Sequence, residues 1–449
     1  MIPLDGALRA TDRTGGLRGA FARAAWSTGL RLLLPLVLLR YFWRGRREPG
    51  YRIGFGERLG YGPGHPPGAL WLHAVSLGET RAAAALVAAL RAQRPGLTLL
   101  LTHGTATGRD AGRALLQPGD RQAWLPLDTP GAVRRFLDRQ RPALGVLMET
   151  EVWPNLLQAA AARGLPMVLA NARLSVRSLR RGQRLAALLR PAAASFAAVL
   201  AQSAGDAERL RAGGAQDVAV CGNLKFDGAP SVALLAQGRQ WHAALARPVV
   251  LAAITREGEE APLLRAWRDQ RQAHEAPAPL LLVVPRHPQR FDEVARLIEG
   301  QGLRLARRSA WGEAPAAADR QADAWLGDSL GEMPLYYAAA DAALLGGSFA
   351  PLGGHNLIEA AACGCPLVMG PSTFNFAEAA EQSLAAGAAW RVADIDAGLA
   401  QALRIAHDVP AREAASARAL AFAALHRGAA ARMAARILAL WPVTSTAAR

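Results

Sequence analysis

Two segments in the first half of the chain carry carboxylates where strands are predicted to end. Glu79 lies in HAVSLGET, after a predicted buried strand and at the start of a helix, so its side chain could accept a proton from a hydroxyl nucleophile. The same position would favour the helix N-terminus through the helix dipole, and the surrounding residues do not choose between the two roles. In METEVWPNL, the alternation of an extended chain places Glu149 and Glu151 on one side, which favours a shared site. No His or Asp set accompanies them at metal-ligand spacing.

A lysine in the segment GNLKFD is the third candidate, because Lys225 is the chain's only lysine. The other members of the 52 Lys and Arg residues are all arginine, a bias typical of high-GC codon usage. Where arginine fills almost every cationic position, a retained lysine indicates a site that needs a compact ammonium rather than a planar guanidinium. Chance retention of the lysine is the alternative.

The second half carries segments that suit an anionic ligand. In VVPRHPQRF, Arg286, His287 and Arg290 directly follow a predicted strand and could bind a phosphate or carboxylate. The glycine-rich segment at residues 346–371 follows a strand and precedes a helix and another strand, so its backbone could approach a ligand closely. Glu359, in the first turn of that helix, could accept hydrogen bonds from sugar hydroxyls.

These candidate residues need an α/β scaffold, because they follow predicted strands. From Ala69 onward, short apolar runs alternate with Ala-, Leu- and Arg-rich helical segments, which predicts parallel sheets covered by helices. The alternation pauses between Cys221 and Arg247, where we place a domain boundary. We expect strands near residues 70–75, 97–102, 143–148, 166–170, 197–201 and 218–220, and again near 249–253, 280–284, 324–326, 342–345 and 366–369.

The N-terminal region contains one membrane-like segment, at residues 24–43. Arg31 and Arg40 interrupt it and Pro35 lies in its apolar centre, so it differs from a clean span of about 20 apolar residues. The arginines and aromatic residues at its end suit an element that enters the lipid with its apolar body and keeps a cationic, aromatic rim at the headgroups. The alternative is an ordinary buried first helix.

Length and composition limit the classes of protein. The 449 residues suit two domains of roughly 200 residues each, and 51% hydrophobic residues favour a folded globular protein over disorder. The formal net charge of +16 indicates an anionic partner, such as a nucleic acid, an anionic membrane or a phosphorylated substrate. Three cysteines without metal-ligand spacing fit a reducing cytosol better than a disulfide framework.

Eight motifs, in order between Tyr51 and Phe376, resemble those of the 3-deoxy-D-manno-octulosonic acid (Kdo) transferases, which transfer Kdo from CMP-Kdo to a lipid A precursor. They are RxGFGERLG, HAVSLGET, METEVWPN, NARLSxRS, GNLKFD, VPRHPQRF, GDSLGEM and GGHNLIEAAA. The resemblance implies a GT-B glycosyltransferase, with two Rossmann-like domains facing a cleft. The implied parts are an N-terminal membrane-associating segment (1–50), an acceptor domain (51–228) and a CMP-sugar-binding domain with C-terminal helices (229–449).

The resemblance also implies roles for individual residues. Glu79 would be the catalytic proton acceptor, and Glu149 and Lys225 would stabilise the transition state. The implied reaction inverts the anomeric centre and needs no metal or other cofactor. Its acceptor is lipid IVA, in lipopolysaccharide synthesis. The implied location is the cytoplasmic side of the cell inner membrane, and the anionic surface of that membrane is a further expected partner. The implied CMP contacts are Pro285, Arg286, Leu330, Gly331, Glu332, Asn356, Leu357, Ile358 and Glu359.

The chain departs from the family pattern at two places near the donor site. HNLIE replaces the usual HNPLE, so we expect backbone contacts from Leu357 and Ile358; and Ile254, Thr255 and Arg256 stand where Ser, Thr and His are usual. One alternative function is that of another GT-B transferase, with a UDP-sugar donor. Another is a non-enzymatic basic nucleic-acid-binding protein, although the sequence lacks a helix-turn-helix, a zinc finger and a basic aromatic strand motif.

Overall fold

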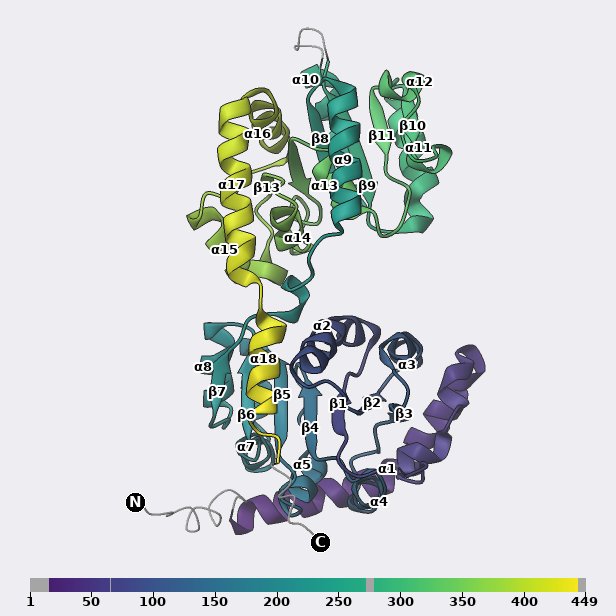
Figure 1. Cartoon of the computed structure of the whole chain (residues 1–449), viewed down its shortest axis with the longest axis vertical. Coiled ribbons are helices and arrows are strands. Elements are labelled where there is room, and N and C mark those ends of the chain that lie inside the picture. The colour runs from purple at the N-terminus through teal and green to yellow at the C-terminus, as the bar shows by residue number, and fades with distance from the viewer. Residues whose placement is uncertain (1–15, 65, 272–277, 443–449) are drawn as a thin grey trace. The chain divides into compact units, whose positions relative to one another are not determined.

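The computed structural model describes residues 16–64, 66–271 and 278–442. They form two compact units, one made of the residues up to Gly228 together with those from Gly428 onward, and the other of Ala229–Arg427. Each unit is a sheet with helices on both of its faces (Figure 1). The sequence analysis assigns the residues after Arg427 to the second domain, whereas the structure places the described part of this segment in the first unit.

The first unit has a seven-stranded parallel sheet with the order β3-β2-β1-β4-β5-β6-β7. The direction in which strands are added reverses between β1 and β4. The carboxyl ends of β1 and β4 therefore flank a topological switch point, where open α/β sheets place their ligands. The strands are β1 (Leu70–His73), β2 (Leu99–His103), β3 (Arg121–Trp124), β4 (Leu144–Met148), β5 (Met167–Ala172), β6 (Ala198–Ala201) and β7 (Val218–Val220).

Apolar clusters cover both faces of this sheet. One cluster joins the strands to Leu86 and Leu90 of α2 and to Met433 and Ile437 of α18, and α18 packs against α2. The C-terminal helix α18 thus belongs to the first unit because its apolar side chains complete this unit's core. The helices of the unit are α1 (Leu17–Arg47), α2 (Leu77–Gln93), α3 (Ala106–Gly112), α4 (Pro130–Gln140), α5 (Pro154–Ala161), α6 (Val176–Gln183), α7 (Ala186–Ala194), α8 (Ala204–Ala212) and α18 (Ala429–Leu438).

The second unit repeats the topology, with the strand order β10-β11-β9-β8-β12-β13-β14 and parallel pairing. Its switch point lies between β8 and β12. The loops that follow these two central strands are therefore the expected place for a ligand. The strands are β8 (Val249–Thr255), β9 (Leu280–Pro285), β10 (Leu305–Arg307), β11 (Ala324–Leu326), β12 (Ala342–Leu345), β13 (Leu367–Met369) and β14 (Ala389–Arg391).

Helices also cover both faces of the second sheet. Trp267 of α10, Ile298 of α11 and Leu403 of α16 share an apolar cluster with the strands, while α9 packs against α13. The helices of the unit are α9 (Val232–Leu245), α10 (Glu260–Arg271), α11 (Phe291–Gly300), α12 (Ala317–Arg320), α13 (Met333–Ala338), α14 (Leu357–Ala362), α15 (Ala377–Ala385), α16 (Ile395–His407) and α17 (Val409–His426).

Helix α1 lies along the first unit with most of its apolar residues in solvent. It packs on α5 and α7, and two hydrogen bonds fix it: Trp26 Nε1 donates to Asp128 Oδ2 at 3.2 Å, and Ser27 Oγ donates to Asn155 Oδ1 at 2.9 Å. Leu32 is nevertheless 75% exposed, so a buried first helix is the wrong description. By length and composition α1 could cross a membrane, and it fits a membrane-associating segment.

The sequence analysis misses three strands, β3, β10 and β14, and all three lie at a sheet edge. An edge strand needs burial on fewer sides, so its sequence lacks the continuous apolar run of a central strand. Strand β3 reads RQAW and its first residue is exposed, while β10 and β14 span three residues each and end in arginine.

Candidate active site

Glu79 is held at the start of α2, after β1. Its backbone N–H donates to Ser76 Oγ at 3.4 Å, so Ser76 caps the helix, and Ser76 Oγ donates to Glu79 Oε1 at 3.2 Å. The backbone N–H of Val75 donates to the other carboxylate oxygen at 2.9 Å. The role at the helix N-terminus considered for Glu79 is therefore real, and these bonds fix the carboxylate at the switch point of the first sheet.

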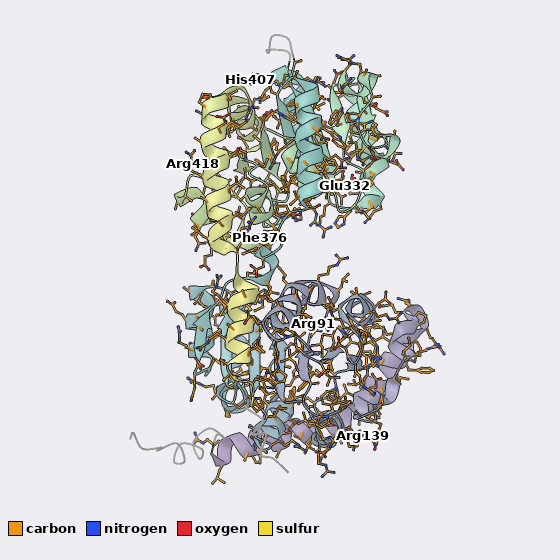
Figure 2. The ribbon with its side chains drawn as sticks, in the orientation of Figure 1. Arg91, Arg139, Glu332, Phe376, His407 and Arg418 are labelled. Atoms are coloured by element: carbon orange, nitrogen blue, oxygen red, sulfur yellow. The ribbon has the colours of Figure 1, made fainter. Side chains whose placement is uncertain are left out.

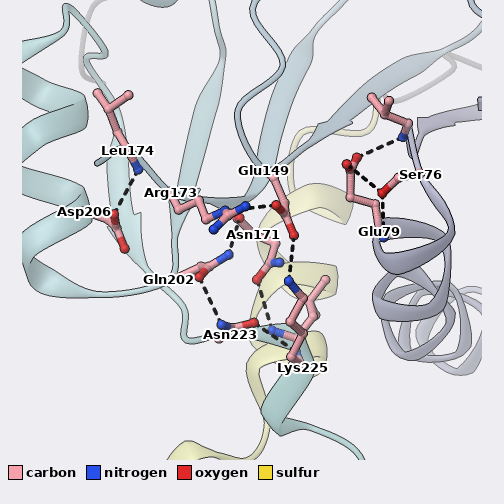
Figure 3. A network of polar contacts seen from close by, with 12 residues as sticks. Ser76, Glu79, Glu149, Asn171, Arg173, Leu174, Gln202, Asp206, Asn223 and Lys225 are labelled. Atoms are coloured by element: carbon pink, nitrogen blue, oxygen red, sulfur yellow. Dashed lines mark hydrogen bonds and ion pairs between the residues drawn. The ribbon is translucent and has the colours of Figure 1, made fainter. Parts of the chain in front are cut away.

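Glu149 lies at the carboxyl end of the neighbouring strand β4, in an unusual backbone conformation. Its φ of +57° is in the left-handed region, which costs an ordinary residue about 1 kcal/mol or more. The side chain is buried, and two cations hold it: Lys225 Nζ lies 3.2 Å from Oε1, and Arg173 Nε donates to Oε2 at 3.0 Å (Figure 3). The strained backbone of Glu149 thus places its carboxylate between the side chains of Lys225 and Arg173.

Lys225 is positioned by amide side chains at the carboxyl ends of the next strands of the sheet: Asn171 lies within the last residues of β5, and Gln202 and Asn223 come after β6 and β7 (Figure 3). The N–H of Lys225 donates to Asn223 Oδ1, and that of Leu224 donates to Asn171 Oδ1, both at 3.0 Å. Gln202 connects the two asparagines, because it accepts from Asn223 Nδ2 at 3.0 Å and donates to the carbonyl of Asn171 at 2.9 Å. Sequence reasoning misses Asn171, Gln202 and Asn223 as site residues. An asparagine directly after a strand was the available signal for Asn171, since Asn tolerates its φ of +51°.

The acids of this site influence one another's ionisation. Burial raises the pKa of Glu79, and the charge of Glu149 raises it further, against the lowering effects of the Val75 amide, Ser76 and Lys225. Burial also raises the pKa of Glu151 to about 7, together with the charges of Glu79 and Glu149 and against a 2.7 Å hydrogen bond from Trp153 Nε1. A carboxylate with a raised pKa is better matched to proton transfer near neutral pH.

In the second unit, one buried carboxylate ties the two loops of the switch point together. Glu259, which follows β8, accepts from the N–H of Gly347 at 2.8 Å and of Arg256 at 2.9 Å through Oε2, and from that of Phe349 at 3.2 Å through Oε1. Gly346 must be glycine, because a Cβ there would lie 2.2 Å from the carbonyl oxygen of Ile254. Sequence reasoning misses Glu259, although its place after a central strand was visible.

Basic side chains gather around the same loops. The pKa of His355 is lowered to about 4 by burial and by the nearby charges of Arg286, Arg256 and His287. The N–H of Arg286 donates to the carbonyl of Thr255 at 2.9 Å and its side chain is exposed, so its guanidinium is available to an anion. We call Arg256, Arg286, His287 and His355 the basic cluster. Its composition suits a phosphate group.

Arg290, by contrast, is engaged within the protein. Its side chain pairs with Glu260 at 2.7 Å and with Glu293 at 2.9 Å, and Glu260 also accepts from Thr255 Oγ1 at 2.8 Å. Only the first two members of the Arg286, His287 and Arg290 set therefore belong to the basic cluster, and Arg290 fixes the β8 and β9 ends.

The residues implied as CMP contacts follow β9, β11 and β12, at one edge of the second sheet. Leu330 is 75% exposed and Gly331 has a φ of +82°, so their loop offers backbone groups. The carboxylate of Glu332, labelled in Figure 2, is bound by Arg308 at 2.8 Å and by Ser329 Oγ. Pro285 is the last residue of β9 and is buried.

The start of α14 holds the remaining implied contacts. Asn356 caps the helix by accepting from the N–H of Ile358 at 3.2 Å. Leu357 and Ile358 are each 1% exposed, so their side chains belong to the core and only their backbone could reach a ligand. Burial raises the pKa of Glu359, and no hydrogen bond or ion pair joins its carboxylate to another residue in the described parts of the chain. Glu359 is thus free to accept hydrogen bonds from a ligand.

The chain resembles proteins of one enzyme family along most of its length. Residues 53–228 match the family model described as 3-deoxy-D-manno-octulosonic-acid transferase (kdotransferase). The 3-deoxy-D-manno-octulosonic acid transferase of Bordetella pertussis is 49% identical over 91% of this chain and 96% of the relative. The transferase of the same name from Haemophilus influenzae is 35% identical over 79% of this chain and 84% of the relative.

Solved structures with little sequence identity share the fold. A glycosyltransferase from Rickettsia africae has a TM-score of 0.55 and 12% identity, covering 83% of this chain and 99% of that one. A UDP-GlcNAc 2-epimerase from Neisseria meningitidis has a TM-score of 0.54 and 15% identity, with the same coverage. The α/β layout and its GT-B expectation are therefore confirmed. Together with the close relatives, the ordered motifs and the two switch-point sites, this means that the chain belongs to the Kdo transferase family and is a glycosyltransferase of the GT-B fold.

Proposed function

We propose that this protein transfers Kdo from CMP-Kdo to the lipid A precursor lipid IVA, with inversion at the anomeric centre, in lipopolysaccharide biosynthesis. The observation that carries the proposal is the placement of Glu79 and Glu149 at the switch point of the first sheet, in a chain 49% identical to a Kdo transferase of nearly equal extent. Family membership favours this reading over a UDP-sugar donor and over nucleic-acid binding.

In this proposal Glu79 is the general base. It removes the proton from a glucosamine hydroxyl of the acceptor while the acceptor oxygen forms a bond to the anomeric carbon of Kdo. The bond from that carbon to the phosphate oxygen breaks at the same time, and CMP leaves with the electron pair. The raised pKa of Glu79 supports this role, and its bonds to Val75 and Ser76 fix the direction of the carboxylate.

Glu149 and Lys225 are proposed to stabilise the transition state. Lys225 keeps 43% of its side chain exposed although it contacts Glu149, so its ammonium remains accessible to developing negative charge. Glu149 is itself between two cations and serves best as the group that orients Lys225. Preorganised charges of this kind are worth several kcal/mol in enzymes, because they need no reorganisation during the reaction.

For the donor, we assign the phosphate of CMP to the basic cluster and the ribose hydroxyls to Glu359. Leu357, Ile358, Leu330 and Gly331 would contribute backbone groups, which agrees with the buried side chains of the first two. In the described parts of the chain, no group of three or more His, Cys, Asp and Glu side chains is placed to hold a metal ion. We assign the neutralisation of the leaving phosphate to the protein's own cations, Lys225 and the basic cluster.

The location we propose is the cytoplasmic face of the inner membrane. Helix α1 ends in Tyr41, Phe42 and Trp43 beside a cluster of arginines, and Arg46 lies 5.3 Å from the ring centre of Trp43. Aromatic and cationic residues at the end of an apolar helix suit the headgroup layer, and basic clusters are attracted to the anionic cytoplasmic leaflet.

The direct test is mass spectrometry of the product formed from CMP-Kdo and lipid IVA by the purified full-length protein. We expect the acceptor mass to rise by one or more Kdo residues, and the mass gives their number. A matched reaction with UDP-glucose in place of CMP-Kdo should leave the acceptor unchanged. Transfer from the UDP-sugar and none from CMP-Kdo would overturn the assignment of the donor.

A further inference from the structure

An apolar pocket of about 360 Å³ opens on the first unit beside Glu149. Its size falls within the range of small-molecule sites, roughly 300–1,000 Å³. The sheet contributes Leu169 of β5 and Val199 of β6. The helical walls are built by Leu179 and Gly182 of α6, Ala186, Leu189 and Ala193 of α7, and Leu210 and Ala212 of α8. Most of these side chains are hydrocarbon, so the pocket suits an apolar occupant.

One end of this pocket reaches the proposed active site. Glu149 and Thr150, at the end of β4, line the pocket, and so does Arg173, which lies 3.0 Å from the carboxylate of Glu149. An occupant of the apolar interior would therefore present its other end at the edge of the sheet that carries the catalytic carboxylates. A ligand with an apolar part and a polar, reacting part fits this arrangement.

Arginines also lie around the pocket. Arg173 and Arg190 line it and have exposed side chains, whereas Arg177, Arg180, Arg181 and Arg184, on α6 and the residue after it, line a separate groove. No ion pair joins these four to an acid in the parts of the chain that the structure describes. Unpaired arginines favour a phosphate or other anion, because a guanidinium binds such groups through two hydrogen bonds. Apolar walls together with the exposed side chains of Arg173 and Arg190 suit an anionic amphiphile.

A helix that forms one wall of the pocket also contacts the candidate membrane helix. Helix α7, which forms one wall, packs against α1, and α1 exposes Leu32, Leu33 and Leu36 by 51–75%. A hydrocarbon chain could therefore pass from the lipid phase along α1 to the pocket without its apolar surface being transferred far into water. This places the pocket where a lipid substrate would arrive.

From these contacts we propose that the pocket binds a hydrocarbon chain of the anionic glycolipid acceptor. The inference rests on the proposed function, since it names a subsite for that function's acceptor. Each buried methylene adds binding energy remote from the reacting hydroxyl, and such energy can orient that hydroxyl at Glu79. The pocket would then select acylated over deacylated acceptors.

A pair of neighbouring substitutions on α7 tests the subsite. Ala186 lines the pocket, whereas Ala187 is exposed and does not, so Ala186→Trp fills the pocket and Ala187→Trp is a matched control. We expect the ratio of kcat/KM for lipid IVA to that for its deacylated form to fall about tenfold or more in Ala186→Trp. The ratio in Ala187→Trp should equal that of the wild type. Equal ratios in both variants would overturn the subsite.

A second substitution that fills the pocket keeps the test valid if Ala186→Trp fails to fold. A Cβ at Gly182, on α6, would have Leu189 Cδ1 as its nearest neighbour at 3.6 Å, an ordinary contact, so Gly182→Leu should be accepted and extend into the pocket from the opposite wall. Leucine also favours a helix more than glycine does. We expect Gly182→Leu to lower the same ratio. A folded Gly182→Leu with the ratio of the wild type would contradict the proposal even if Ala186→Trp were unstable.

Direct binding separates this inference from the proposed function. Titration calorimetry with dodecyl phosphate should give tighter binding to wild type and Ala187→Trp than to Ala186→Trp. If this pattern holds but the wild type transfers no Kdo to lipid IVA, the proposed function fails and the subsite remains. If the wild type transfers Kdo and all three proteins bind dodecyl phosphate equally, the subsite alone fails. Displacement of dodecyl phosphate by phosphatidylglycerol vesicles but not by lipid IVA would overturn the acceptor as the occupant.

Discussion

The two units share one strand topology but carry opposite chemistry at their switch points. Between β1 and β4 the groups that face a ligand are carboxylates, Glu79 and Glu149, with one lysine oriented by the second of them. Between β8 and β12 the groups are the basic cluster, and the buried carboxylate Glu259 points inward to three backbone amides. In both units the fold determines where the site lies, and the side chains of the loops after the strands determine the charge of the site.

The two sites also differ in how they are held. In the first unit, amide side chains from successive strand ends position Lys225, and Glu149 accepts a left-handed backbone. In the second unit, the carboxylate of Glu259 fixes two loops. Ile254, which has a left-handed backbone conformation there, has no polar side chain. A network of side chains suits a catalytic site, where orientation decides the rate, while a rigid backbone loop suits binding.

The largest expected effect comes from removing the proton acceptor of the first unit. Glu79→Gln should reduce kcat by about 10²–10⁴-fold, because an amide cannot accept the proton. The amide oxygen can still accept from the N–H of Val75, so the start of α2 should be preserved. Steady-state transfer assays measure the loss. CMP affinity, measured by calorimetry, should remain that of the wild type, and substantial turnover would refute the role as base.

The next effect tests whether the first unit needs its lysine. We expect Lys225→Arg to lower kcat by about 10²-fold although the charge is kept, because a planar guanidinium cannot occupy the ammonium position beside Glu149. Arg134→Lys, the opposite exchange at an exposed position of α4, is the control and should have little effect on kcat. A near wild-type rate for Lys225→Arg would mean that the lysine is retained by chance.

A smaller effect is expected when the second unit loses one member of its basic cluster. Arg286→Ala should weaken CMP binding about tenfold, because a hydrogen bond to a charged group contributes about 1.5–3 kcal/mol. Arg265→Ala removes an exposed arginine from α10 and should leave CMP affinity intact. Titration calorimetry with CMP compares the two. Equal affinities would show that the basic cluster does not bind the phosphate.

The pH dependence of the rate should depend on the acids of the first unit. Glu79 must be ionised to accept a proton, so activity is lost as the pH falls through its raised pKa. The charge of Glu149 raises the pKa of Glu79, and Glu149→Gln should therefore move the acid limb of kcat, measured on the activity that this variant keeps, to lower pH by less than about one unit. Glu208→Gln replaces an exposed acid on α8 and should leave the acid limb of the kcat profile unchanged. A shift to higher pH would contradict the proposed coupling.

The sequence predicts the central features of both sites and misses those that depend on tertiary contacts. Eleven of the strands were visible as apolar runs, and the three missed ones are edge strands with polar or short sequences. Glu79, Glu149 and Lys225 could be named because each follows a strand in a distinctive motif. Gln202 and Glu259 could not, because their roles are to bind other parts of the protein, and such partners are far apart in the chain.

The assignment of α18 is the clearest case of this limit. From the sequence, an Ala-rich amphipathic segment after Arg427 could cover either sheet. Asp227 decides the outcome, because its carboxylate accepts from the N–H groups of Gly428, Ala429 and Ala430 and so caps the helix in the first unit. These are contacts between residues about 200 positions apart, and no local pattern predicts them.

The smallest expected effect concerns the stability of each unit separately. Asp227→Ala removes the cap of α18 and should destabilise the first unit by about 1 kcal/mol. The matched change is Asp394→Ala, which removes the cap of α16 in the second unit, where Asp394 Oδ1 accepts from the N–H of Ala397 at 2.9 Å. Urea unfolding followed by hydrogen exchange should show protection lost from α18 and α2 in the first variant and from α16 in the second. Protection lost across both units in either variant would mean that the units unfold as one, and that the two sites are not energetically separate.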